Sequence, residues 1–290
     1  MTGYEAIDSV LGKNCRWEET LIMRSDSWVV RIWKLAYPLL IHFAVSMLVS
    51  LIFSVIMLLG SSGEELTEAD VLRLSLPMSL AIDVLVLPVL FWFFRRDSHR
   101  LIPVKMKTTP LHWIVLVLCG ASACLAANFL ISLSGLVWLF YDQYQEVSSL
   151  LYSGGIWMEL ILMAIFAPCV EELLFRGLIF RRLRTYCTFP VALVVSALLF
   201  GVYHGNVVQG VYAFLLGMAM AFVYERFRTI WAPIVFHGSA NLISVVVTEI
   251  PQISNWLDAH VFSVMLITIA LALGTLYLIQ FNLRPKEEQG

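Results

Sequence analysis

The chain has 290 residues, of which 60% are hydrophobic and 14% charged, and its formal net charge is −2. Soluble domains carry about 25% charged residues, so this composition excludes an ordinary soluble protein. Five scattered cysteines without a C-x-x-C pair argue against a disulfide framework and against a thiolate zinc site. We therefore predict an all-α, polytopic membrane protein whose surroundings are the lipid bilayer, with no nucleic acid as a partner.

Eight segments are apolar enough to cross a bilayer, which takes about 20 residues as a helix. In chain order they lie at about residues 36–60, 74–94, 111–133, 155–180, 189–206, 207–225, 230–249 and 260–281. If these spans alternate in direction, 18 of the 19 Lys and Arg residues fall on one side of the membrane, and only Arg73 does not. Because basic residues gather on the cytoplasmic side, we expect both termini to be cytoplasmic.

Three polar clusters interrupt the most apolar part of the chain. They are Glu171-Glu172-x-x-x-Arg176, Phe200-x-x-x-His204 and His237-x-x-x-Asn241. An ionised residue at bilayer depth costs roughly 2.5–3.5 kcal/mol on insertion scales, and intramembrane ionisable groups usually mark functional sites. The clusters are therefore the candidate site.

The two adjacent glutamates differ in their expected surroundings. Glu172 and Arg176 are four residues apart and share a helix face, where they can form an ion pair. Glu171 is rotated by about 100° from Glu172 and has no cation on its own face. We therefore expect Glu172 to be structural and Glu171 to be chemically active. Pro168, just before them, removes a helix hydrogen bond and favours a kink.

The clusters lie at a similar depth in the membrane, so they can converge. With a rise of about 1.5 Å per residue, Glu171, His204 and Asn241 lie about 18–22 Å from the cytoplasmic ends of their helices. His237 shares a face with Asn241, about one turn away. Such a site suits hydrolysis, with Glu171 and His204 activating a water. His237 and Asn241 would then donate hydrogen bonds to the oxyanion of a tetrahedral intermediate.

Zinc is the alternative to metal-free hydrolysis. Two histidines and a carboxylate can bind zinc, and Glu171, His204 and His237 would be its ligands. No H-E-x-x-H motif occurs, however, and asparagine is an uncommon zinc ligand. We therefore favour the metal-free reaction and expect no cofactor, with zinc kept as the alternative.

Each polar residue also has a plainer interpretation when it is taken alone. Glu172 and Arg176 alone would indicate a helix-packing ion pair, and Phe200 alone indicates packing. A lone histidine or asparagine in an apolar helix usually makes interhelical hydrogen bonds. The joint occurrence of the three clusters is what favours a catalytic site.

The three motifs, in this order on consecutive apolar helices, resemble the CPBP family. That family comprises the CaaX prenyl endoproteases of the Rce1 type and the bacterial abortive-infection and bacteriocin-immunity membrane proteins. The resemblance covers roughly residues 155–245. Flanking residues are also similar to the family: Ala167-Pro168, Phe175-Arg176-Gly177, Tyr224-Glu225-Arg226 and Trp231-Ala232-Pro233.

The resemblance implies an eight-helix intramembrane endopeptidase in a bacterial plasma membrane, acting on a membrane-associated peptide or protein. The catalytic residues it implies are Glu171, His204, His237 and Asn241, and the supporting residues are Glu172, Arg176 and Phe200. On this basis we divide the chain into a cytoplasmic N-terminal segment, three helices with their loops, the catalytic core helices, and the last helix with a cytoplasmic tail. These parts are expected at 1–35, 36–150, 151–250 and 251–290.

Two other functions compete with a protease. A non-catalytic membrane protein that binds a peptide, such as an immunity factor, would have no need of Glu171. A transporter with a proton relay through His42 and Asp83 would show inverted repeats, and we detect none in the sequence. His42, Asp83 and Asn128 stand alone in the first three spans, and we leave them out of the site.

Overall fold

The computed structural model describes residues 26–60, 67–98 and 108–282. Within these ranges every regular element is a helix, which confirms the all-α prediction. Six of the helices are long and apolar enough to cross a membrane, so the chain is a multi-pass membrane protein. The count of eight spans and the orientation of the termini stay predictions.

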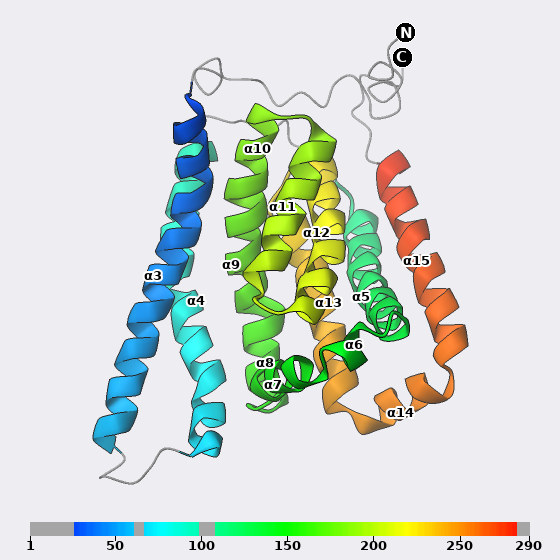
Figure 1. Cartoon of the computed structure of the whole chain (residues 1–290). Coiled ribbons are helices and arrows are strands. Elements are labelled where there is room, and N and C mark those ends of the chain that lie inside the picture. The colour runs from blue at the N-terminus through cyan, green and yellow to red at the C-terminus, as the bar shows by residue number, and fades with distance from the viewer. Residues whose placement is uncertain (1–25, 61–66, 99–107, 283–290) are drawn as a thin grey trace.

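The first two described helices form a hairpin along one side of the molecule, drawn in blue and cyan in Figure 1. They are α3 (Trp28–Gly60) and α4 (Glu68–Ser98). Both are longer than the predicted spans, since hydropathy does not register polar caps. Thr67 and Asp70 cap α4 reciprocally: the Asp70 N–H donates to the Thr67 hydroxyl, and the Thr67 N–H donates to the Asp70 carboxylate. Most of the predicted segment 1–35 lies outside the described residues, and α3 already occupies its end.

The helix that carries the two glutamates is one unbroken run of five segments, which we call the motif helix. It consists of α8 (Ile156–Ile161), the π-helix η1 (Leu162–Phe166), α9 (Ala167–Glu172), the π-helix η2 (Leu173–Phe180) and α10 (Arg181–Tyr186). Two π segments thus flank the glutamates, a common feature of functional sites. The run continues six residues past the predicted end at residue 180.

Five further long helices complete the bundle: α5 (Pro110–Leu133), α11 (Phe189–Tyr203), α12 (Val207–Phe227), α13 (Trp231–Glu249) and α15 (Val261–Asn282). α5 packs against α13 and α15, and α11 packs against α12. Gly120 of α5 lies directly against the Phe236 carbonyl of α13, where a side chain would not fit. Three short helices, which the sequence did not predict, lie at the lower end in Figure 1: α6 (Leu136–Leu139), α7 (Tyr141–Leu151) and α14 (Pro251–Ala259).

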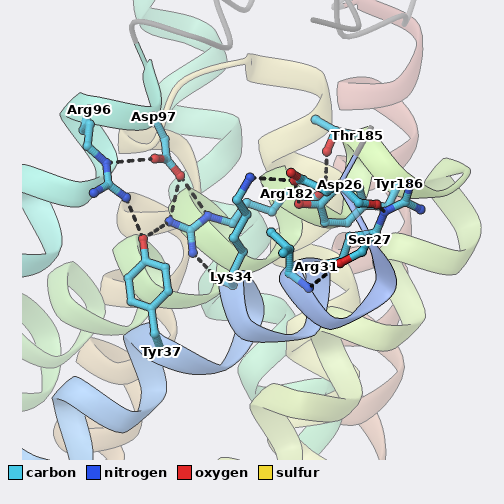
Figure 2. Close-up of polar contacts among 11 residues, drawn as sticks. Asp26, Ser27, Arg31, Lys34, Tyr37, Arg96, Asp97, Arg182, Thr185 and Tyr186 are labelled. Carbon is cyan, nitrogen blue, oxygen red and sulfur yellow. Dashed lines mark hydrogen bonds and ion pairs between the residues drawn. The ribbon is translucent and has the colours of Figure 1, made fainter. Parts of the chain in front are cut away.

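A cluster of buried polar contacts fastens the α3–α4 hairpin to the motif helix at the upper end in Figure 1, and Figure 2 shows it in detail. The Arg182 side chain is 2% exposed and donates through Nε and Nη2 to the Asp97 carboxylate of α4, both at 2.8 Å. It also donates to the Lys34 carbonyl and the Tyr37 hydroxyl of α3. One guanidinium therefore ties three helices together.

Candidate active site

A fully buried ion pair lies at the centre of the motif helix. Arg176 Nη1 donates to Glu172 Oε1 at 2.8 Å, and neither side chain is exposed. Arg176 Nη2 donates to the Gly217 carbonyl of α12 at 3.0 Å, and the guanidinium lies 4.5 Å from the centre of the Phe200 ring. These contacts hold Glu172 and Arg176 in place.

His237 of α13 lies between the two carboxylates of the motif helix. Its Nδ1 donates to Glu172 Oε1 at 2.9 Å, so this oxygen serves two donors. Its Nε2 lies 3.7 Å from Glu171 Oε2. Because Glu172 fixes one ring nitrogen, the other is aimed at Glu171.

Glu171 is the more accessible of the two acids. Its side chain is 17% exposed, whereas that of Glu172 is fully buried. The difference follows from the turn of about 100° between neighbouring positions in α9. Glu171 is therefore the carboxylate that a water or substrate can reach.

Phe200 separates the two histidines. Its ring packs edge-on against His204, with the ring centres 4.8 Å apart, and edge-on against His237 at 5.9 Å. The His204 Nδ1 lies 2.8 Å from the Phe200 carbonyl, which can only accept a hydrogen bond. Nδ1 therefore carries the proton, and in the neutral ring Nε2 is left as an acceptor.

His204 lies where the chain leaves α11, in a turn that needs glycine. Gly205 follows with φ of 73°, a left-handed conformation that glycine adopts without strain. Asn206 then caps α12 by accepting from the Gln209 N–H at 2.8 Å. This turn sets the position of the imidazole at the end of its helix.

Asn241 binds the motif helix at the π segment η1. Its Nδ2 donates to the Met163 carbonyl at 2.7 Å. In η1 the Ala167 N–H bonds to the Leu162 carbonyl, five residues back. The next donor in that register would be residue 168, which is a proline without an N–H. Asn241 therefore supplies the hydrogen bond that Pro168 cannot make.

The structure brings Glu171, Glu172, Arg176 and His237 into direct contact and places Phe200 and His204 beside them. In the described part of the chain, no hydrogen bond or ion pair joins His204 or Asn241 to Glu171. Nor do the described residues contain three His, Cys, Asp or Glu side chains grouped to hold a metal ion.

Two of the isolated polar residues lie at the site after all. His42 Nε2 of α3 is 3.1 Å from the hydroxyl of Tyr203, which precedes His204. Asp83 of α4 is buried on the helix that packs against α9, the segment that carries Glu171. Asn128, in contrast, contacts Cys124 on its own helix. The sequence signal for the first two was an ionisable residue inside an apolar span, a pattern typical of functional sites.

Comparisons with known proteins agree with the motifs. A family model described as "Type II CAAX prenyl endopeptidase Rce1-like" matches residues 153–243. A Bacillus subtilis (strain 168) protein described as "Putative membrane peptidase YdiL" is 30% identical over 110 residues, which cover 38% of this chain and 45% of the relative. The match thus spans less than half of this curated relative. No solved structure matches the chain. The resemblance to the CPBP family is confirmed.

Proposed function

We propose that this chain, a member of the Rce1-like CPBP family of membrane peptidases, is an intramembrane endopeptidase. Its substrate would be a membrane-associated peptide or protein, cut near its C-terminus or within the segment that reaches the site. The observation that carries the proposal is the accessible Glu171 carboxylate, 3.7 Å from a histidine that a second, buried glutamate holds in place.

In the proposed reaction Glu171 is the general base. It takes a proton from a water that His204 also holds, through the acceptor nitrogen Nε2 left free by the Phe200 carbonyl. The water oxygen attacks the peptide carbonyl carbon and forms a tetrahedral intermediate. Glu171 then passes the proton to the leaving amine, so the bond breaks without a charged amide leaving group.

His237 and Asn241 would stabilise the oxyanion of that intermediate. An imidazole whose Nδ1 is held by Glu172 presents Nε2 to the site, and in its doubly protonated form it donates from there. The Asn241 carboxamide has two N–H groups, and the Met163 carbonyl takes one of them. The second is then held in a fixed direction, and preorganised donors of this kind matter most in a site shielded from water.

The proposal predicts that Glu171→Gln abolishes cleavage and leaves the fold intact. General acid–base catalysis contributes about 10²–10⁴-fold to a rate, so the loss should be at least of that size. The measurement is mass spectrometry of a peptide library incubated with the purified full chain. The library would contain prenylated CaaX peptides together with bacterial leader and signalling peptides.

The matched control is the Gln variant of a second acid, Glu68→Gln at the exposed start of α4, which should cleave like the wild type. Each protein would be run with and without a zinc chelator, which decides between metal-free and metal-dependent hydrolysis. An active Glu171→Gln protein would refute the proposed role of Glu171. A folded wild type that cleaves none of the peptides would favour a non-catalytic peptide-binding protein.

A further inference from the structure

Asp83 lies at mid-height of α4 and is almost fully buried. It is 15 residues from either end of that helix, which corresponds to about 22 Å on each side. Only 8% of the residue is exposed. Its neighbours along the chain, Ile82 and Val84, are apolar. The carboxyl group is therefore far from both membrane surfaces.

The surroundings of Asp83 belong to the candidate active site. α4 packs against α9, the segment that carries both motif glutamates. Leu76 of α4 lies against Gly154, and Phe94 of α4 lies against Gly177 of the motif helix. Asp83 stands between Leu76 and Phe94, so it lies at the level of the segment that carries Glu171. It belongs to a helix outside the motif region.

Asp83 is the acid at this site without a partner. Glu172 binds Arg176 and His237, and Glu171 lies beside His237. Among the residues that the structure describes, Asp83 makes no hydrogen bond and no ion pair. Burying a carboxylate without a partner is very costly, so the neutral acid is the form that this environment favours. A neutral carboxyl group has an O–H to donate.

We propose that Asp83 is a positioning residue of the active site, whose neutral carboxyl donates a hydrogen bond to the water that Glu171 activates. This rests on the proposed hydrolytic function. In the described part of the chain no hydrogen bond joins Asp83 to Glu171, and one water can bridge two polar groups that do not touch. A water held by Asp83, Glu171 and His204 has a fixed direction of attack.

The role requires a donor of the right size and no charge, which makes two substitutions informative. Asp83→Asn keeps the shape and replaces the O–H donor by an N–H donor. Asp83→Leu keeps the number and branching of the heavy atoms and removes every polar atom, which a buried apolar environment tolerates or prefers. Asn should therefore retain most of kcat, whereas Leu should lower kcat about tenfold to a hundredfold with KM and Tm nearly unchanged.

The matched control is Ser79→Ala, one turn earlier on α4. The Ser79 hydroxyl donates to the Ser75 carbonyl of its own helix at 2.9 Å, so its removal should leave kcat unchanged. An Asp83→Leu protein with wild-type kcat would overturn the proposal. So would an Asp83→Asn protein as impaired as Asp83→Leu, because the charged form would then be the active one.

A second measurement does not depend on cleavage. A protonated carboxyl group gives its own C=O stretching band in the infrared spectrum, and the wild-type minus Asp83→Asn difference at neutral pH should contain it. The Ser79→Ala difference should not. If the band is missing, Asp83 is charged and the proposal is wrong. If the wild type cleaves no peptide at all, the proposed function fails, and the infrared difference still decides whether Asp83 is a neutral acid.

Discussion

At the scale of single residues, the site keeps buried charges by giving each of them several partners. Glu172 Oε1 accepts from both Arg176 and His237, and Arg176 also reaches the Gly217 carbonyl and the Phe200 ring. Removing one partner from such a buried group costs more than the pair itself contributes, because the remaining charge is left without compensation. Glu172 therefore fixes the orientation of His237.

We expect Glu172→Gln to destabilise the protein strongly. The buried Arg176 guanidinium would lose its counter-charge, which typically costs about 3–5 kcal/mol. Thermal unfolding of the purified protein in detergent should show a clearly lower Tm and a reduced yield. Glu171→Gln, at the neighbouring and more exposed position, is the matched control and should keep the wild-type Tm.

The double variant Glu172→Gln/Arg176→Met separates charge from packing. Removing both charges should recover part of the lost stability, because no unpaired ion is left in the interior. If Glu172→Gln alone unfolds at the wild-type temperature, the ion pair is not structural.

The contacts between single residues could be predicted from the sequence only in part. Spacing alone predicts the helix face that Glu172 shares with Arg176, and the structure contains that ion pair. The contact between Glu172 and His237 joins positions 65 residues apart, and its detail depends on how α13 lies against the motif helix. No local pattern encodes that distance. For the same reason the place of Asp83 beside Glu171 could not be read from the chain.

At the scale of elements, α13 packs along the motif helix and comes very close to it at Gly238. A Cβ atom on Gly238 would lie 2.7 Å from the Ala164 carbonyl oxygen in η1. Gly238 lies directly after His237 and one turn before Asn241. The close contact between the helices therefore positions both of these side chains. Gly238 therefore serves a close contact between two helices.

We expect Gly238→Ala to push α13 away from η1. Overpacking of this kind costs about 1–3 kcal/mol. Displacement of His237 and Asn241 should lower the cleavage rate further, since misplacing catalytic groups by about 1 Å can cost a hundredfold. Thermal unfolding and peptide cleavage measure the two effects.

The control for Gly238→Ala is Gly274→Ala in α15, where a Cβ atom would meet nothing within 4 Å. Alanine is a better helix former than glycine, by about 1 kcal/mol at most, so this variant should be as stable as the wild type or more stable. Equal Tm values and cleavage rates in the two variants would mean that α13 can move away at Gly238 without affecting stability or the site.

Hydropathy predicted the long helices well because each is apolar over most of its length. Hydropathy could not predict the π segments, since a run of apolar residues has the same hydropathy in an α-helix and in a π-helix. It also missed α7 and α14, whose mixed composition resembles a loop. The ends of α3 and α4 were misplaced because helices continue into polar sequence where caps and ion pairs support them.

At the scale of the whole molecule, the α3–α4 hairpin stands against the motif helix and is fastened at one end by Arg182 (Figure 2). The same hairpin carries His42 and Asp83 to the site. The buried Arg182–Asp97 pair therefore links the stability of the hairpin to the geometry around Glu171.

We expect Arg182→Leu to loosen the hairpin. Asp97 is 4% exposed and would keep only the longer ion pair with Arg96, at 3.6 Å, so the cost should reach at most the about 3–5 kcal/mol typical of a buried charge left alone. Hydrogen exchange followed by mass spectrometry should show faster exchange in α3 and α4, with α12 and α13 nearly unchanged.

Lys34→Ala is the matched control, because it removes a partly exposed pair with Asp26 and keeps the backbone carbonyl that Arg182 uses. Such pairs contribute about 1 kcal/mol or less. Uniformly faster exchange in all helices after Arg182→Leu would show that the cluster stabilises the entire bundle and not the hairpin in particular.

The hairpin lies wholly outside the residues that the family model matches, 153–243. The motif residues and the hairpin beside them thus come from separate stretches of the chain. The first stretch carries the three motifs, and the second carries His42 and Asp83. Substitutions in α3 and α4 can therefore alter the surroundings of the motif residues without changing any of those residues.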